Sequence, residues 1–276
     1  MDDLQKPNPF VKWVGGKRQV INQHLAQLFP KQFNNYIEPF VGGGAALFHL
    51  QPENAIVNDL NAELINAYQM LQKHPQALMN QLDHYKTQHS ESFYYHIRNA
   101  KLDTNLERAA RFIYLNKTAF NGLYRVNQKN EFNVGFNQVS QDKLNLYNPT
   151  NLQNVTNYLN NNNIQFHSGD YQKILQLAQK GDFIFCDPPY DYEINTKGFT
   201  SYTKSGFNQN NQIVLAQKLK ELDSQGVKWM VTNHNTQLIN HLYQDFKIKP
   251  IATNRNINSV GSKRKATGKE VVITNY

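Results

Sequence analysis

Short apolar runs rich in β-branched and aromatic residues alternate along the chain with longer segments of helical periodicity. Helical spacing of apolar residues fills most of the intervals, as at 60–71, 171–179 and 213–222. Strands that alternate with helices in this way are typical of an α/β fold with one largely parallel sheet. The seven runs that predict strands are residues 35–38, 55–58, 164–167, 183–186, 227–232, 246–251 and 270–274.

The spacing of the strands is broken once, since about 100 residues separate the second strand from the third, far more than a crossover connection needs. Helical patterns at 75–85 and 106–120 fill much of this interval. A loop punctuated by Gly and Asn follows them at 121–137. The interval is therefore expected to hold an additional structural unit.

We predict a mainly helical domain over 62–150, inserted into a sheet domain that is formed by 1–61 and 151–276. The polar tract at 160–163 is expected to be a loop before the third strand.

The charge of the chain narrows the choice of partners. The 276 residues include 29 Lys and Arg against 21 Asp and Glu, which gives a formal net charge of +8. Ten basic and seven acidic side chains lie in 62–150, and five and one in 251–276. An excess of positive charge favours nucleic acid, an anionic surface or an acidic ligand as partner. The insert and the C-terminal segment are the two regions that carry most of this excess.

The sequence favours an intracellular, non-membrane protein. No run of about 18 apolar residues occurs, which excludes membrane-spanning helices. The first ten residues, MDDLQKPNPF, lack the basic and apolar regions of a secretory signal. The only cysteine, Cys186, excludes an internal disulfide. We therefore expect a location in the reducing cytoplasm.

A glycine-rich turn, FVGGG at 40–44, follows the first predicted strand. Glycine lets the backbone turn sharply and approach a ligand closely because no Cβ is in the way. The turn departs from the dinucleotide-binding fingerprint, since Leu47 stands where Gly or Ala is required, and it lacks the Lys-Ser/Thr of a P-loop. A plain tight turn is the alternative interpretation.

An acidic residue, Asp59, ends the second predicted strand. A carboxylate at that place in an α/β sheet can accept both hydroxyls of a ribose, as in sites for nucleoside cofactors. The alternative role for Asp59 is to cap the helix that begins at Leu60.

The tetrapeptide DPPY at 187–190 directly follows the apolar run at 183–186. Two prolines cannot continue a central strand, so the chain leaves the sheet at its carboxyl end, where α/β folds bind ligands. A carboxylate, a proline carbonyl and an aromatic face suit a planar base with an exocyclic amine, because they supply two acceptors and a ring for stacking. The alternative is an ordinary turn with a solvent-facing Asp187 and a packed Tyr190.

Together these motifs resemble those of the Dam-like N6-adenine DNA methyltransferases, the alpha group of the D12 class. The resemblance spans nearly the whole chain. It implies a Rossmann-like sheet that binds S-adenosylmethionine, with an inserted target-recognition domain. It also implies methyl transfer to a flipped adenine in duplex DNA. GATC is the expected site, and relatives that act on other sites containing GAT share much of the same pattern. The matching segments are KWVGGK at 12–17, FVGGG at 40–44, ND at 58–59, residues 116–127, EFN at 131–133 and DPPY at 187–190.

The resemblance implies catalytic roles for Asp187, Pro188 and Tyr190. Three of the positions that are implied to bind the cofactor have alternative roles, since Trp13 could be a core residue, Lys17 a solvated helix charge and Asp170 a helix cap. The positions implied to bind the cofactor are Trp13, Lys17, Phe40, Gly42, Asp59, Asp170 and Asp187.

The segment 116–127 is dense in side chains that can contact DNA. Arginine can read guanine with two hydrogen bonds, asparagine can read adenine, and an aromatic or leucine side chain can enter a base step. In the family this segment and Lys12 read bases, while Lys117 suits either a phosphate or a base contact. The basic loop before the last strand suits phosphate contacts, or simple solvation. The expected DNA-contacting residues are Lys12, Lys117, Phe120, Asn121, Leu123, Arg125, Asn127, Asn133, Lys263, Arg264 and Lys265.

Two other functions stay open from the sequence. One is a methyltransferase that acts on another amine, such as an RNA adenine or a protein glutamine, and the other is a DNA-binding relative that has lost catalysis. We expect double-stranded DNA as the partner, no metal, a monomer in solution and a place on the nucleoid in the cytoplasm.

Overall fold

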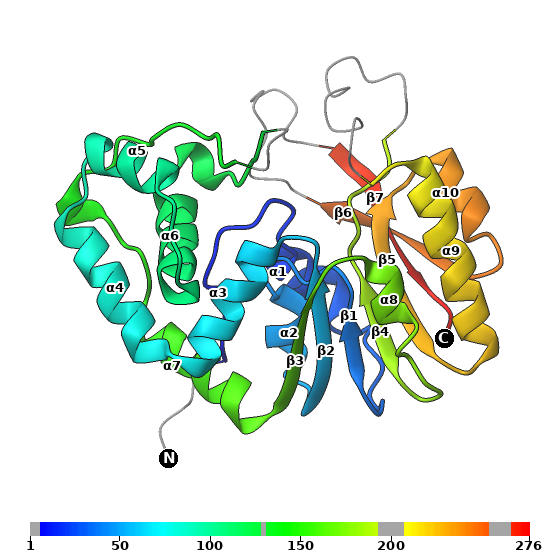
Figure 1. Cartoon of the computed structure of the whole chain (residues 1–276). Coiled ribbons are helices and arrows are strands. Elements are labelled where there is room, and N and C mark those ends of the chain that lie inside the picture. The colour runs from blue at the N-terminus through cyan, green and yellow to red at the C-terminus, as the bar shows by residue number, and fades with distance from the viewer. Residues whose placement is uncertain (1–5, 128–130, 193–206, 254–265) are drawn as a thin grey trace. The chain divides into compact units, whose positions relative to one another are not determined.

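The computed structural model describes residues 6–127, 131–192, 207–253 and 266–276. Within them the strands form one seven-stranded sheet, in the order β3-β2-β1-β4-β5-β7-β6 (Figure 1). All seven predicted strands are present, with their ends shifted by a few residues. They run over Tyr36–Glu38 (β1), Asn54–Asp59 (β2), Asn163–Ser168 (β3), Phe183–Cys186 (β4), Lys228–His234 (β5), Lys247–Thr253 (β6) and Ala266–Thr274 (β7).

The pairing of the strands confirms the predicted α/β fold with a largely parallel sheet. β1 pairs in parallel with β2 and with β4, and β4 pairs in parallel with β5. β7 is antiparallel to both β5 and β6. All four residues of β4 are buried, as expected for a strand that is covered on both faces. The strand order reverses between β1 and β4, and α/β sheets bind ligands beside the carboxyl ends at such a reversal.

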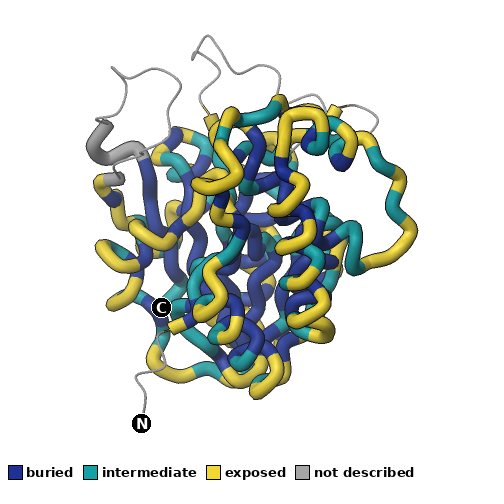
Figure 2. The backbone as a smooth tube through the Cα atoms, turned by 90° about the vertical axis from the view of Figure 1, so that its left-hand side faces the viewer, coloured by how far each residue is buried: buried dark blue, intermediate teal, exposed yellow. Residues whose placement is uncertain are grey.

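The chain divides into two compact units that alternate along the sequence. In Figure 2 the buried stretches of backbone lie mainly inside and the exposed stretches mainly on the outside. The first unit comprises Met1–Arg18, Val41–Glu53 and Asn58–Gly169, and the second unit comprises Gln19–Phe40, Asn54–Val57 and Asp170–Tyr276.

Helix α6 (Asn105–Thr118) is the central helix of the first unit, because α3, α4 and α5 all pack against it. It begins at a capping box in which Thr104 and Glu107 satisfy each other's backbone N–H groups. The other helices of this unit are α2 (Ala45–Leu50), α3 (Ala62–Lys73), α4 (Pro75–Thr87), α5 (Glu91–Asn99), η2 (Phe120–Gly122), η3 (Gln141–Lys143) and α7 (Pro149–Asn161).

Helix α9 (Gln209–Ser224) packs against β5 and α10 (Gln237–Leu242) in the second unit. The spacing predicts an apolar face of Ile213, Ala216, Leu219 and Leu222, of which the last three are buried and Ile213 is half-buried. A capping box between Asn208 and Asn211 begins the helix. The short helices α1 (Arg18–Val20), η1 (Ile21–Leu25) and α8 (Tyr171–Leu175) complete the described elements.

Three predicted boundaries are wrong. The helix predicted over 171–179 ends at Leu175. The asparagine tract at 160–163 is not a loop, since α7 continues to Asn161 and β3 begins at Asn163. The Asn162 side chain donates to the Tyr158 carbonyl at 2.8 Å and closes the end of the helix. The helix predicted over 106–120 ends at Thr118, because the next residue adopts an extended backbone with ψ 154°.

Candidate functional site

The glycine-rich turn of the first unit is fitted closely around its neighbours. Gly42 has a φ of +48°, and a Cβ at this position would stand 2.6 Å from Cδ1 of Trp13. Gly44 has a φ of +73°, and a Cβ there would stand 2.6 Å from the Tyr68 hydroxyl. That hydroxyl donates to the Gly42 carbonyl at 3.0 Å. Only glycine fits these two positions, which makes the turn more specific than a plain tight turn requires.

Asp59 is tied to this turn by a backbone hydrogen bond. Its Oδ2 accepts the Gly42 N–H at 3.0 Å and its Oδ1 accepts the Asn61 N–H at 2.9 Å. The helix cap is Asn61 rather than Asp59, because the Asn61 side chain accepts from two N–H groups in the first turn of α3. Burial raises the pKa of Asp59 above its ordinary value, and the two backbone donors oppose that rise.

Lys17 is not the solvated charge that its sequence position also allowed. Lys17 is only 6% exposed, and its Nζ donates to the Gly15 carbonyl at 2.7 Å. Trp13 is half-buried, with its ring stacked on Tyr124 at 5.9 Å and tilted against Phe112. These contacts bring Trp13, Gly42 and Asp59 into one cluster of the first unit.

Phe40 and Asp170 belong to the second unit and lie in different settings. Phe40 follows β1 and packs against Tyr171 and Phe207, with ring centroids at 5.1 and 5.6 Å. Asp170 is exposed and caps α8, since its Oδ1 accepts the Gln172 N–H at 3.0 Å. The cap that the sequence offered as an alternative for Asp170 is therefore present.

Asp187 follows β4 and is oriented by the neighbouring strand β5. The Thr232 hydroxyl donates to its Oδ1 at 2.5 Å. Thr232 itself is fully buried, so the carboxylate has a rigid neighbour on one side. The preceding residue, Cys186, is buried in the strand, and burial raises the pKa of its thiol well above the ordinary value. A buried thiol of this kind is suited to packing rather than to nucleophilic attack.

Buried amide side chains hold the backbone of the proline turn. Gln212 of α9 donates to the Pro189 carbonyl at 2.8 Å. Asn233 of β5 accepts the Asp191 N–H at 2.9 Å and donates to Gln212 at 3.0 Å. The Asp191 carboxylate in turn accepts the Thr236 hydroxyl at 2.6 Å. The turn is therefore fixed by side chains as well as by its prolines.

Sequence reasoning did not identify these supporting residues. A signal for some of them was present, because the apolar run of β5 ends in the polar residues Thr232, Asn233 and His234. Polar residues at the carboxyl end of a parallel strand point to a functional edge of the sheet. Gln212 gave no such signal, since it lies within an ordinary amphipathic helix.

The ring of Tyr190 is half-buried and its hydroxyl is engaged. The hydroxyl donates to Glu270 Oε2 at 3.2 Å, and Glu270 is only 3% exposed. The ring edge meets His234 at 4.9 Å between centroids, at an interplanar angle of 73°. His234 also contacts the exposed Tyr192 edge-on at 4.6 Å. These contacts hold the Tyr190 ring from two sides.

The segment predicted to contact DNA begins at the end of α6. Phe120 is 55% exposed, an unusual exposure for a large aromatic side chain. Asn121 has a φ of +55° and is exposed. Lys12 is exposed, whereas Lys117 and Leu123 are half-buried.

The segment then folds back on itself. An antiparallel bridge joins Val126 to Phe132. Asn133 Oδ1 accepts the Arg125 Nε–H at 2.9 Å, which fixes the guanidinium plane while its terminal nitrogens keep the fork geometry that suits a guanine edge. Asn127 donates to the Glu131 carboxylate at 2.9 Å. Lys263, Arg264 and Lys265 lie outside the described residues.

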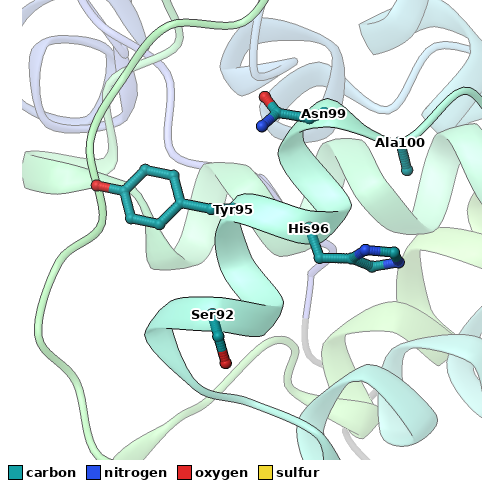
Figure 3. A pocket seen from close by; sticks show the side chains of 5 residues that line it. All are labelled: Ser92, Tyr95, His96, Asn99 and Ala100. Atoms are coloured by element: carbon teal, nitrogen blue, oxygen red, sulfur yellow. The ribbon is translucent and has the colours of Figure 1, made fainter.

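A shallow cavity of about 510 Å³ lies on α5 and is lined by Ser92, Tyr95, His96, Asn99 and Ala100 (Figure 3). None of these five residues belongs to the predicted site. Among the described residues, no group of three or more His, Cys, Asp or Glu side chains is placed to hold a metal ion. No helix in the described parts of the chain has the length and apolar character to cross a membrane.

Comparison with known proteins identifies the family to which the chain is similar. The model of the D12 class N6 adenine-specific DNA methyltransferases matches residues 13–257. A type II methyltransferase of Lactococcus lactis subsp. cremoris is 41% identical, over 97% of this chain and 95% of its own length. A type II methyltransferase of Methanocaldococcus jannaschii is 37% identical, over 97% and 99%. A DNA adenine methylase of Haemophilus influenzae is 30% identical, over 94% and 91%.

Proposed function

Because this chain belongs to the D12 class of N6 adenine-specific DNA methyltransferases, we propose that it moves a methyl group from S-adenosylmethionine to adenine N6 in duplex DNA, within GATC. The observation that carries this proposal is the proline turn of the second unit. Asp187 is oriented there by Thr232, and the Tyr190 ring is held by Glu270 and His234. A fixed carboxylate beside a fixed ring supplies the contacts that an adenine with its exocyclic amine requires.

The residues of the first unit fit a nucleoside cofactor. Each Asp59 oxygen accepts one backbone N–H and has a further lone pair for a ribose hydroxyl. Gly42 lies against Trp13 with no room for a Cβ, so the turn and the indole form one surface. The residues proposed to hold S-adenosylmethionine are Trp13, Lys17, Phe40, Gly42, Asp59, Asp170 and Asp187. When bound, the cofactor supplies a methyl group on a sulfonium centre that is open to nucleophilic attack.

Asp187 and the carbonyl of Pro188 act on the nucleophile. Adenine N6 is a poor nucleophile because its lone pair is delocalised into the ring. Acceptance of its two N–H bonds by the Asp187 carboxylate and the Pro188 carbonyl favours a more tetrahedral nitrogen and frees the lone pair. The carboxylate then stabilises the positive charge that develops on N6, and it accepts the proton that N6 must lose and passes it to solvent. Positioning and electrostatics supply the rate enhancement, without a covalent intermediate on the enzyme.

Tyr190 holds the target base once it has left the duplex. Adenine N6 is paired and stacked in B-form DNA, so the nucleotide must be extruded before its amine can reach Asp187. The ring of Tyr190 provides a face for stacking, and its hydroxyl anchors that ring to Glu270.

The ring of Tyr190 is expected to matter more than its hydroxyl. Tyr190→Phe retains the stacking face and should reduce kcat by only a few-fold, whereas Tyr190→Ala should reduce it by about tenfold to 100-fold, as expected when a stacking interaction is removed. Tyr192→Ala is a matched control, because Tyr192 contacts the same histidine. Steady-state methylation of a GATC duplex at saturating substrate measures kcat for all three variants. Equal losses for the two Tyr190 variants would argue against stacking.

Duplex DNA is read by the segment that follows α6, together with Lys12. The hydrogen bond from Arg125 to Asn133 supports a contact of the guanidinium with a guanine edge. The exposure of Phe120 supports its insertion into a base step, and the half-buried Leu123 is the second candidate for that role. Lys117, Asn121 and Asn127 complete the proposed contacts. Residues 62–150, which include this segment, are proposed as the target-recognition domain.

DNA binding is expected to depend on the protonation of Lys117. Burial, followed by the charge of Lys12, lowers the pKa of Lys117 to about 8. A phosphate or base acceptor favours the charged amine and raises this pKa in the complex, so binding takes up a proton. Duplex affinity, measured at constant ionic strength, should therefore be constant below about pH 8 and fall as the pH rises above it. Lys117→Arg should remove this dependence, and an unchanged pH profile in that variant would contradict the assignment.

The basic segment near the C-terminus is expected to contact phosphates. Replacing Lys263, Arg264 and Lys265 with glutamine should reduce the slope of log affinity against log salt by about 2.7, at roughly 0.9 for each phosphate that is no longer neutralised. Titrations of cognate and unrelated duplexes at several salt concentrations measure the slope. The control replaces the exposed residues Lys31, Lys180 and Lys228, of which the first two precede β1 and β4 and the third begins β5. A slope that changes equally in both triple variants would oppose the proposal.

Transfer of labelled methyl groups tests the proposed function. The purified protein, supplied with methyl-labelled S-adenosylmethionine, should label a GATC duplex. A matched duplex in which purine, which lacks the N6 amine, replaces the adenine of GATC on both strands should stay unlabelled. Labelling of RNA or of protein instead would support an amine other than DNA adenine. Cofactor binding without any transfer would support a DNA-binding relative that has lost catalysis.

A further inference from the structure

Lys12 is held through its backbone by a single buried side chain. Asn116 Oδ1 accepts the Lys12 N–H at 2.7 Å, and Asn116 Nδ2 donates to the Lys12 carbonyl at 2.7 Å. Asn116 is 0% exposed, on the last turns of α6. The planar amide of Asn116 thus bonds both the N–H and the carbonyl of Lys12, as a neighbouring β-strand would do. This pair of bonds fixes the rotation of the Lys12 backbone as well as its position.

The stem of the Lys12 side chain is fixed by the turn that follows α6. A Cβ at Gly122 would stand 2.5 Å from Lys12 Cδ and 3.3 Å from Lys12 Cβ, so the stem lies directly on this glycine. Gly122 has a φ of +62° and is flanked by Asn121 and Leu123, two of the proposed DNA-contacting residues. Lys12 therefore leaves the surface at a place that Asn116 and Gly122 define together.

The next residue along the chain is anchored on the other side. Trp13 stacks on Tyr124 at 5.9 Å and covers Gly42. Asn116 holds the backbone of Lys12 and Tyr124 holds the ring of Trp13. The peptide that joins Lys12 to Trp13 therefore has little freedom to rotate. The direction in which the exposed Lys12 amine extends is thus set by groups that do not themselves need to contact a base.

We propose that Asn116 is a positioning residue for sequence discrimination, which acts by presenting Lys12 to the base that Lys12 reads. This inference rests on the proposed DNA-reading role of Lys12. It adds Asn116 as a residue that supports this role without contacting DNA itself. A displaced lysine still supplies charge, so the loss of Asn116 affects the choice of sequence more than the strength of non-specific binding.

A double-mutant cycle tests this proposal. The full-length protein is compared with Lys12→Ala, Asn116→Ala and the double variant on a GATC duplex and on duplexes with one substituted base pair. The readout is the ratio of kcat/KM for cognate over substituted sites. Asn116→Ala should lower this ratio about tenfold, within the range that one mismatched base pair controls. The double variant should discriminate no worse than Lys12→Ala alone, because both changes remove the same interaction.

Asn66→Ala is the matched control, since Asn66 is another buried asparagine of the first unit and donates to the Asn105 carbonyl at 2.8 Å. A comparable fall in Tm with an unchanged ratio is expected for this control. Asn116→Ser, which retains a donor and an acceptor on a shorter side chain, should recover part of the ratio and provides a second variant if the alanine variant does not fold.

The outcomes separate this inference from the proposed function. Additive losses in the double variant, or an unchanged ratio in Asn116→Ala where Lys12→Ala lowers it, would overturn the positioning role and leave the methyltransferase intact. An unchanged ratio in Lys12→Ala would remove the reading role of Lys12, and this inference with it. Absence of methyl transfer by the unmodified protein would instead contradict the proposed function.

Discussion

Asp187→Ala is expected to abolish methyl transfer, with kcat reduced by at least about 1,000-fold, while duplex affinity stays within about twofold. The variant loses the acceptor for one N–H of the adenine amine and the negative charge that stabilises the cationic N6. Preorganised groups of this kind contribute about 100-fold to 1,000-fold each in enzymes. Duplex affinity is spared because the phosphate contacts that dominate it come from other residues. Steady-state methylation measures kcat and a duplex titration measures the affinity.

Asp187→Asn removes the negative charge of the side chain and keeps its shape. The asparagine can still accept the Thr232 hydroxyl, which donates to Asp187 at 2.5 Å, so the turn should keep its geometry. We expect a loss of kcat close to that of the alanine variant, because the charge is gone in both. Near-normal turnover by Asp187→Asn would show that the carboxylate acts only as a hydrogen-bond acceptor. Equal losses of duplex affinity and of turnover in Asp187→Ala would contradict the catalytic assignment.

Asp59→Ala is expected to weaken cofactor binding by about 100-fold. The two ribose hydrogen bonds assigned to this carboxylate are charge-assisted and contribute about 1.5 kcal/mol each, and each 1.4 kcal/mol corresponds to about tenfold in affinity. The variant also removes the acceptor of the Gly42 N–H, so the glycine-rich turn is held less firmly. Calorimetric titration with S-adenosylmethionine measures the change.

Asn61→Ala is the control for Asp59→Ala. Asn61 caps α3, and loss of that cap should lower the free energy of unfolding by about 1 kcal/mol with little change in cofactor affinity. If both variants lose stability and cofactor affinity to the same extent, Asp59 acts as a structural residue only.

The fold was predicted well from the sequence wherever a single local pattern determines an element. Apolar runs marked all seven strands, and the double proline marked the end of β4 at a place where no central strand can continue. The ends of helices were predicted less well. Asn162 closes α7 by a bond to Tyr158, so an asparagine tract that reads as a loop is divided between a helix end and a strand start.

Residues that act on the site through long-range contacts could not be predicted. Gln212 bonds a carbonyl that lies 23 residues away along the chain, and Glu270 meets Tyr190 across 80 residues. Asn116 holds Lys12 across 104 residues. Local patterns hold no information on such pairings, because they arise only when the elements pack. The glycines that lie against Trp13 and Tyr68 were visible as a motif, but the reason for each glycine required the neighbours in space.

Base-resolution mapping of methylated adenines shows whether this protein methylates adenine within GATC and whether Asp187 is required. The protein and its Asp187→Ala variant are expressed separately in a host that lacks adenine methylation, and the host DNA is then sequenced. We expect N6-methyladenine at the adenine of GATC throughout the genome with the unmodified protein and none with the variant. Unmethylated DNA with a folded, cofactor-binding protein, or N6-methyladenine at GATC in cells that express the variant, would contradict this expectation.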